Sequence, residues 1–154
     1  MFKIVFVCTG NTCRSPMAAV LLADLAARAG LAGTIHVESA GIAAGRQPAS
    51  AGAQAVMRQA GLNLDKHYSR QLSLVQLQNA DLVLTMTQTH KRAAAGMAPG
   101  LAGKIYTLAE LAGQAGDVAD PYGGSEVQYR NCARQIQQYL EAAWGKIVTL
   151  AGKK

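Results

Sequence analysis

The segment Cys8–Ser15 (CTGNTCRS) separates an apolar run from a helical one. The apolar run, Phe2–Val7, is rich in β-branched and aromatic residues and predicts a buried strand. Pro16 is typical of a helix start, and a helix is expected from Ser15 to about Ala29, with Gly30 as its stop. A loop that leads into a helix presents backbone N–H groups and the positive end of the helix dipole. The segment therefore predicts an anion-binding loop.

Two side chains of this loop, Cys8 and Arg14, predict chemistry at phosphorus. A cysteine reacts as its thiolate, which a helix N-terminus and a neighbouring cation stabilise. The guanidinium of Arg14 can bind two phosphoryl oxygens at once. Gly10 and Asn11 tolerate the left-handed backbone of a tight anion cradle, and Ser15 can donate a hydrogen bond to the Cys8 sulfur. A Cys-x5-Arg pair arises easily by chance, so the prediction depends on the strand, the Ser-Pro pair and the helix around it.

Residues 7–16 (VCTGNTCRSP) resemble the signature of the low-molecular-weight protein-tyrosine phosphatase family, and the likeness covers most of the chain. The resemblance implies a two-step, metal-independent reaction in which Cys8 is the nucleophile, Arg14 holds the phosphoryl oxygens and Asp120 is the general acid. It also implies that the other loop residues and one later aromatic residue bind the substrate, namely Thr9, Gly10, Asn11, Thr12, Cys13, Ser15 and Tyr122.

Further strands and helices alternate along the chain. Strands are expected at 34–39, 81–86 and 104–108, and helices at 49–60, at 74–78, after residue 87 and from residue 125 onward. The alternation predicts an α/β fold with a four-stranded parallel sheet and helices on both faces. The resemblance implies the phosphotyrosine phosphatase I-like, Rossmann-like form of this fold, as one domain at 1–150 with a loose tail at 151–154. In such sheets ligands bind at the carboxyl ends of the strands, where the Cys8 loop lies.

The loop at residues 117–125 (DVADPYGGS) is the second segment that predicts chemistry. Its glycines and Pro121 mark a loop, and loops on a rigid scaffold carry functional side chains. The family places its general acid at the aspartate of an Asp-Pro pair in this region, which corresponds to Asp120. A placed acid contributes about 10²–10⁴-fold by protonating the leaving group. From the residues alone, Asp117 competes for this role. The resemblance implies that Tyr122 flanks the cleft.

The resemblance also implies supporting roles for Ser39 and His67. Ser39, near the end of the second strand, is expected to hold the loop asparagine, although from the residues alone it equally starts a turn. His67 is expected to brace the phosphate loop. His36 and His90 are expected to be structural or exposed to solvent.

The three cysteines do not predict a disulfide framework, because their number is odd and the chain is not a small secreted one. Cys132 lies on the apolar stripe of the closing helix and is expected to pack in the core. The resemblance implies that Cys13 can capture oxidised Cys8 as a reversible disulfide. Zinc ligation by Cys8, Cys13 and a histidine matches no common spacing and would block the nucleophile. No metal and no cofactor is therefore expected.

Composition limits the function classes. The chain has 154 residues, half of them hydrophobic, which is enough for one full core. No apolar run reaches the roughly 18 residues of a membrane span, and the N-terminal run is too short for a signal peptide, so a cytoplasmic protein is expected. The net charge of +6 favours phosphorylated proteins or peptides as partners, with inorganic phosphate or sulfate binding in the loop. No basic cluster with interleaved aromatic residues indicates nucleic-acid binding.

Two phosphorylated side chains compete as the substrate. Phosphotyrosine is the default of the family. Thr12, where phosphotyrosine enzymes usually carry a bulky aliphatic residue, instead resembles the bacterial protein-arginine phosphatase branch, as do residues 80–87 and 116–125. Many family members carry an aromatic residue in the connection at 43–48, and this chain has none. The sequence leaves phosphotyrosine and phosphoarginine nearly balanced.

Two other functions on the same fold are disfavoured. Arsenate reduction needs further cysteines to relay a disulfide, and none lies between Cys13 and Cys132. A non-catalytic phosphate-binding module would need neither Cys8 nor Asp120.

Overall fold

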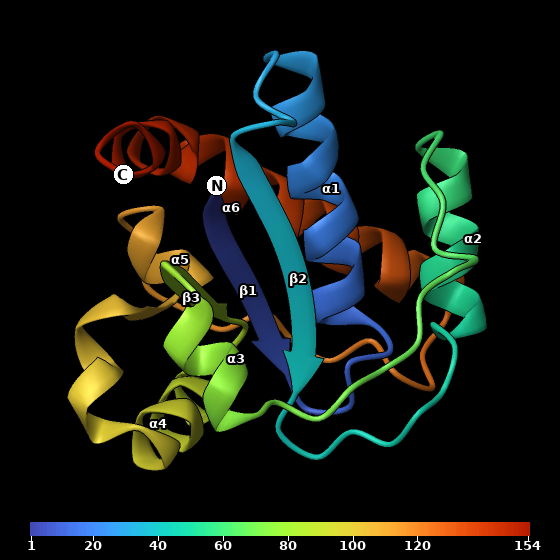
Figure 1. Ribbon diagram of the computed structural model, residues 1–154. Helices are drawn as coiled ribbons and strands as arrows, with labels where there is room; N and C mark the ends of the chain where they lie inside the picture. Colours follow the sequence, from blue (N-terminus) through green and yellow to red (C-terminus); the bar gives the residue numbers. More distant parts are fainter.

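A four-stranded parallel sheet forms the centre of the computed structural model, which describes residues 1–154 (Figure 1). The strands stand in the order β2-β1-β3-β4, with bounds β1 (Phe2–Cys8), β2 (Ile35–Gly41), β3 (Leu82–Thr85) and β4 (Ile105–Thr107). Every neighbouring pair is parallel, so the carboxyl ends of the strands meet at one edge. The predicted α/β fold is confirmed.

The central strand β1 is apolar throughout its buried length because helices cover both faces of the sheet. Successive side chains of a strand point to opposite faces. Ile4 and Phe6 therefore enter the larger core, whereas Val5 and Val7 enter the smaller one. Cys8 continues the row of Ile4 and Phe6, so its sulfur faces the layer that contains the first helix.

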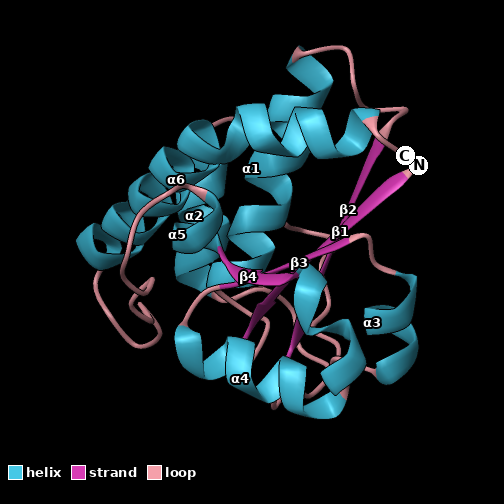
Figure 2. Cartoon of the chain, turned by 90° about the vertical axis from the view of Figure 1, so that its left-hand side faces the viewer, coloured by secondary structure: helices cyan, strands magenta, loops and turns pink.

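The helices lie in two layers, one on each face of the sheet (Figure 2). One layer holds α1 (Arg14–Arg28), α2 (Ala51–Gln59), α5 (Leu108–Leu111) and the long α6 (Glu126–Gly152), which packs against the other three. The opposite layer holds α3 (Leu74–Asn79) and α4 (Gln88–Met97), followed by the 3-10 helix η1 (Pro99–Lys104). No helix combines the length and the apolar character that crossing a membrane would require.

Three features differ from the sequence prediction. The short elements α5 and η1 were not predicted, because four to six residues are too few to show a periodic pattern. The chain stays helical beyond residue 150, since α6 continues to Gly152. Ala151 is buried one turn after Ile147 and extends the apolar stripe of the helix. Lys154 Nζ lies 2.8 Å from Asp81 Oδ2, so the chain end contacts the sheet layer and is not a loose tail.

Candidate active site

The loop between β1 and α1 presents unpaired backbone donors. Residues 9–13 connect Cys8 to Arg14, the first residue of α1. None of the N–H groups of residues 9–13 donates a hydrogen bond to another protein group. Asn11 has a φ of 57°, in the left-handed region that asparagine tolerates better than most residues. Free amides at the start of a helix are the arrangement that binds an anion.

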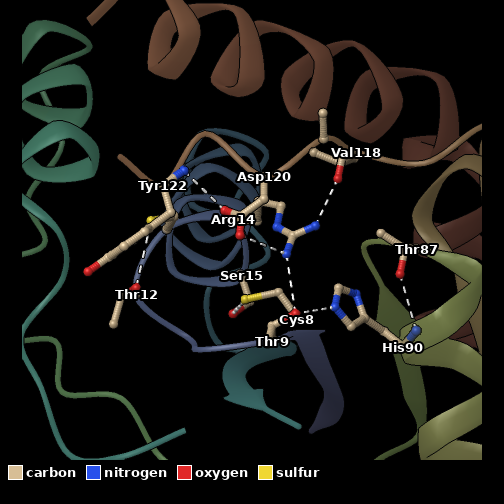
Figure 3. A network of polar contacts seen from close by, with 12 residues as sticks. Cys8, Thr9, Thr12, Arg14, Ser15, Thr87, His90, Val118, Asp120 and Tyr122 are labelled. Carbon is tan, nitrogen blue, oxygen red and sulfur yellow. Dashed lines mark hydrogen bonds and ion pairs between the residues drawn. The ribbon is translucent and has the colours of Figure 1, made fainter. Parts of the chain in front are cut away.

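A chain of hydrogen bonds leads from the backbone to the Cys8 sulfur. Asn11 Oδ1 accepts from the Arg70 N–H at 3.0 Å, so Asn11 Nδ2 is the atom that donates to Ser15 Oγ at 2.7 Å. Ser15 Oγ thus acts as an acceptor toward Asn11, and its own proton points elsewhere. Cys8 Sγ lies 2.9 Å from Ser15 Oγ, the shortest remaining contact (Figure 3). We assign the hydroxyl proton to this contact, which stabilises a negatively charged sulfur.

The end of β2 supports the loop from below. A Cβ atom on Gly41 would lie 2.4 Å from the Thr9 carbonyl oxygen, so only glycine fits this close approach of two backbones. The N–H groups of Ile42 and Ala43 donate to the Cys8 and Thr9 carbonyls, each at 2.9 Å. The strand positions the loop through these backbone contacts.

The predicted contact between Ser39 and the side chain of Asn11 is wrong. Both ends of the Asn11 amide are bonded to other partners, the Ser15 hydroxyl and the Arg70 N–H. The strand β2 extends to Gly41, which pairs with Cys8 at the start of the Cys8 loop. Ser39 lies two residues earlier, where it pairs with Phe6 inside the sheet.

His67 makes the contact that a bracing residue needs. Its Nε2 lies 2.7 Å from the Asn11 carbonyl oxygen. Burial lowers the pKa of His67 below its ordinary value, and the hydrogen bond to the Asn11 carbonyl opposes this shift in part. A neutral ring donates its Nε2–H to this carbonyl. The hydrogen bond connects the segment around His67 to Asn11, the loop residue with positive φ.

Both terminal nitrogens of the Arg14 guanidinium contact the protein, and its inner Nε–H does not. Nη1 donates to the Val118 carbonyl at 2.9 Å, and Nη2 contacts Thr9 Oγ1 at 3.4 Å (Figure 3). The side chain is buried, yet its Nε–H has no acceptor in the protein. A buried guanidinium donor without a partner is costly unless a ligand oxygen accepts from it. This geometry suits an oxyanion bound beside the loop amides.

His90 is the residue that the sequence prediction missed. It was expected to be structural or exposed, but it is buried in the site, with Nε2 2.8 Å from Thr9 Oγ1 (Figure 3). Its Nδ1 has no partner. Burial, aided by the Arg14 cation and opposed by the carboxylates Asp117 and Asp120, lowers the pKa of His90 from 6.5 to about 4. The imidazole is therefore neutral near pH 7.

The unpaired Nδ1 of His90 indicates which ring nitrogen carries the proton in the neutral form. An orphaned buried N–H is rarer in proteins than an orphaned acceptor, so we assign the proton to Nε2. Thr9 Oγ1 then accepts from both His90 and Arg14, and the Thr9 hydroxyl proton remains for a bound oxygen. One signal in the sequence could have placed His90 in the site. It lies in the first turn of the helix after β3, at the sheet edge where the Cys8 loop lies.

The structure separates the two aspartates of the second loop. Asp120 Oδ2 lies 3.6 Å from Arg14 Nη2, and Asp120 lines the same pocket as Cys8. Its Oδ1 accepts from the Tyr122 N–H at 3.1 Å. Asp117 instead accepts from the N–H of Gln88 at the start of α4, at 2.9 Å. Of the two aspartates, only Asp120 lines the pocket that contains Cys8.

The pocket has a volume of about 320 Å³ and contains the complete loop. Its mouth is flanked by Tyr122, which is 71% exposed. The connection at 43–48, which lacks an aromatic residue, contributes Ala43, Gly45 and Gln47 to the pocket, so no ring forms this wall. Thr12 completes the wall on the side of Tyr122 (Figure 3).

The remaining cysteines occupy different environments, and all three thiols are free. Cys13 Sγ lies 3.2 Å from Ser50 Oγ and 3.4 Å from the Tyr129 hydroxyl, at the N-terminus of α1. Cys132 is buried on α6, and burial raises the pKa of its thiol to about 12, consistent with the predicted packing role. No three His, Cys, Asp or Glu side chains are grouped so that they could hold a metal ion.

Comparison with known proteins adds a second line of observation. A family model described as low molecular weight phosphotyrosine protein phosphatase matches residues 3–150, a range that includes both the Cys8 loop and the Asp120 loop. Among curated proteins, a protein-arginine-phosphatase of Bacillus subtilis (strain 168) is 40% identical to this chain over 141 residues, covering 89% of this chain and 91% of that protein.

Two further relatives carry the other substrate name. A probable low molecular weight protein-tyrosine-phosphatase, EpsP of Ralstonia solanacearum, is 36% identical over 140 residues, covering 90% of this chain and 91% of that protein. The crystal structure of a low molecular weight protein tyrosine phosphatase from T. tengcongensis has a TM-score of 0.90 at 36% identity, covering 95% of this chain and 99% of that one.

Proposed function

Because the chain belongs to the low molecular weight phosphotyrosine protein phosphatase family, we propose that it hydrolyses phosphotyrosine in proteins and peptides through a cysteinyl-phosphate intermediate. The chain is a phosphomonoester hydrolase. The observation that carries the assignment of residues is the combination of the Cys8 sulfur, five free amides and the unpaired Arg14 donor in one pocket.

In the first step the Cys8 thiolate attacks phosphorus, forming an S–P bond as the P–O bond to the substrate side chain breaks. The Ser15 hydroxyl, held by Asn11, donates to the sulfur and favours its anionic form both before attack and on departure. The loop amides and Arg14 bind the oxygens of the transferring group, where charge is spread in the transition state. Positioning and charge stabilisation supply most of the rate enhancement of such reactions.

Asp120 handles the proton in both steps. In the first step it donates a proton to the departing oxygen, which would otherwise leave as a phenoxide. In the second step its carboxylate accepts a proton from the water that attacks the cysteinyl phosphate, and the S–P bond breaks to release Cys8 and inorganic phosphate. Its place beside Arg14, at 3.6 Å, supports this role.

His90 is a positioning residue for the same reaction. Through its neutral Nε2–H it holds Thr9 Oγ1, which also contacts Arg14. This arrangement directs the Thr9 hydroxyl and the guanidinium toward one bound group. We place the protein in the cytoplasm, where thiols remain reduced, because the mechanism requires a free Cys8.

Phosphoarginine is a second candidate substrate, and two observations favour it. The pocket wall is formed by Thr12, whose hydroxyl can meet a guanidinium or a water, where an aliphatic side chain would pack on an aromatic ring. The relative from Bacillus subtilis, which shares 40% identity, is a protein-arginine-phosphatase. The same Cys8, Arg14 and Asp120 machinery would then break a P–N bond.

One experiment decides between the two substrates. Wild type and Thr12→Ile are compared by kcat/KM on peptides that differ only in carrying phosphotyrosine or phosphoarginine. We expect phosphotyrosine turnover by wild type, and a shift of the ratio toward phosphotyrosine by about tenfold or more in Thr12→Ile, the size that a single side-chain contact in a pocket supplies. A higher wild-type kcat/KM on phosphoarginine would make that residue the substrate.

Cys8→Ser tests the enzymatic reading itself. The variant should release no phosphate from either peptide or from p-nitrophenyl phosphate, while it still binds inorganic phosphate at the loop amides. Phosphate release that survives in Cys8→Ser would exclude the cysteinyl-phosphate mechanism. A wild type that binds phosphate without turnover would indicate a binding module.

A further inference from the structure

A second, larger groove continues from the catalytic pocket. Its volume is about 880 Å³, against about 320 Å³ for the pocket itself. Thr12, Gln47 and Tyr122 line both, so the two cavities share one wall. In Figure 3, Thr12 and Tyr122 lie on the side of the site opposite to His90, which sets the direction of the groove.

The groove lies between the beginnings of α2 and α6 and is lined by small residues. Its floor on the α2 side consists of Pro48, Ala49, Ser50, Ala51, Gly52 and Ala55. Small side chains leave room for the side chains of a ligand, whereas large ones would fill the space themselves. Gly52 is required here, because its Cβ would lie 2.4 Å from the Tyr129 ring that closes the groove.

The groove differs from the catalytic pocket in that no cation lines it. No lysine or arginine lines it, and Glu126 at the start of α6 contributes the one carboxylate. Glu126 is exposed and accepts a hydrogen bond from Gln59 Nε2. Burial raises the pKa of Tyr129 to about 12, so its hydroxyl adds no negative charge at neutral pH. The groove therefore favours a cationic neighbour over an anionic one.

We propose that this groove binds the polypeptide segment of the substrate that adjoins the phosphorylated residue, and that it selects segments with a lysine or arginine there. The proposal rests on the phosphatase function argued above. Thr12, Gln47 and Tyr122 line both the pocket and the groove, so a substrate whose phosphoryl group lies on the Cys8 loop and whose chain leaves the pocket beside Tyr122 continues along the groove. An extended chain advances about 3.3 Å per residue, and Glu126 is the charged residue that such a chain meets in the groove.

The charge preference is tested with peptide pairs that carry Lys or Glu at each of the three positions on either side of the phosphorylated residue. We expect kcat/KM to be about two- to fivefold higher with Lys at one or more positions of one flank, the size of an exposed ion pair. Glu126→Lys should reverse this preference, and 1 M salt should weaken it. Glu141→Lys, an exposed charge reversal farther along α6, is the matched control and should leave it unchanged. No preference on either flank, or the same preference in Glu126→Lys, would overturn the proposal.

The space itself is tested by filling it. Ala55→Trp places a large ring in the groove, outside the residues that contact the phosphoryl group. We expect KM for phosphopeptides to rise several-fold while kcat/KM for free phosphotyrosine or p-nitrophenyl phosphate stays unchanged. Ala142→Trp, at an exposed alanine of α6, is the control. Unchanged peptide KM would remove the groove from the binding site, whereas a wild type without turnover of the small substrates would refute the phosphatase function itself.

Discussion

His90 provides the sharpest test of the site, because its neutral state is linked to protein stability. Burial beside Arg14 lowers its pKa from 6.5 to about 4. On acidification the histidine of the unfolded chain takes up a proton first, and this uptake favours unfolding. His90 therefore lowers the free energy of unfolding as the pH falls from about 6.5 to about 4. Above pH 6.5 the histidine is neutral in both states, and this loss of stability is absent.

The size of the effect follows from the two pKa values. One pKa unit corresponds to about 1.4 kcal/mol, and at pH 5 about 1.5 units of the difference are expressed, giving about 2 kcal/mol. His90→Gln removes the titrating group but keeps an N–H donor for Thr9. Between pH 7.5 and pH 5 wild type should therefore lose about 2 kcal/mol of stability that His90→Gln keeps, so the free energy of unfolding of His90→Gln minus that of wild type should rise by about 2 kcal/mol.

Urea unfolding at the two pH values, with linear extrapolation to water, measures this difference. His36→Gln, at a histidine on the edge strand outside the pocket, controls for loss of any imidazole. In parallel, His90→Ala should lower kcat/KM by about two- to twelvefold, the net value of one hydrogen bond, and His90→Gln should restore most of it. Identical pH dependence in wild type and His90→Gln, together with undiminished turnover by His90→Ala, would refute the reasoning.

Three further predictions concern the proton, the core and the second cysteine. Asp120→Asn should lower kcat/KM, which reports the step in which the leaving group departs, by about 10²–10⁴-fold on a phosphotyrosine peptide and by less on p-nitrophenyl phosphate, whose leaving group is a weaker base; equal losses of kcat/KM on both would argue against a general acid. Gly52→Ala should destabilise the fold by about 1–2 kcal/mol in urea unfolding, because the added Cβ meets the Tyr129 ring, and a stabilised variant would contradict this contact. Cys13→Ser should recover less activity than wild type when thiol is added after peroxide treatment, and equal recovery would show that Cys13 does not protect Cys8.

The local features of the site could be predicted because they depend on neighbouring residues. The strand before Cys8 and the helix after it follow from a run of β-branched residues and a proline in the first turn. The Ser15 contact with the Cys8 sulfur joins residues only seven apart, on either side of one loop, so the motif itself implies it. The prediction failed at Ser39 because the exact end of a strand determines which residue meets the loop, and sequence patterns define strand ends poorly.

The contacts that connect distant segments could not be predicted in this way. The Val118 carbonyl that holds Arg14 is 104 residues away, and a backbone acceptor leaves no mark in the sequence. His90 is separated from Thr9 by 81 residues, and a single histidine in a helix shows no preference for a site over the surface. The groove beside the pocket arises where α2 and α6 begin near each other, and neither helix indicates it alone.

The sequence by itself therefore determined the parallel α/β fold and the strand–loop–helix segment that carries Cys8 and Arg14, because short-range patterning and backbone preference specify them. The tertiary structure decided which aspartate reaches the pocket, how Arg14 and Thr9 are oriented, and where the pocket opens. These features depend on packing between segments that are far apart in the chain. Only when those segments pack together are groups such as Arg14 and His90 buried with an unpaired nitrogen, which is what favours a bound ligand.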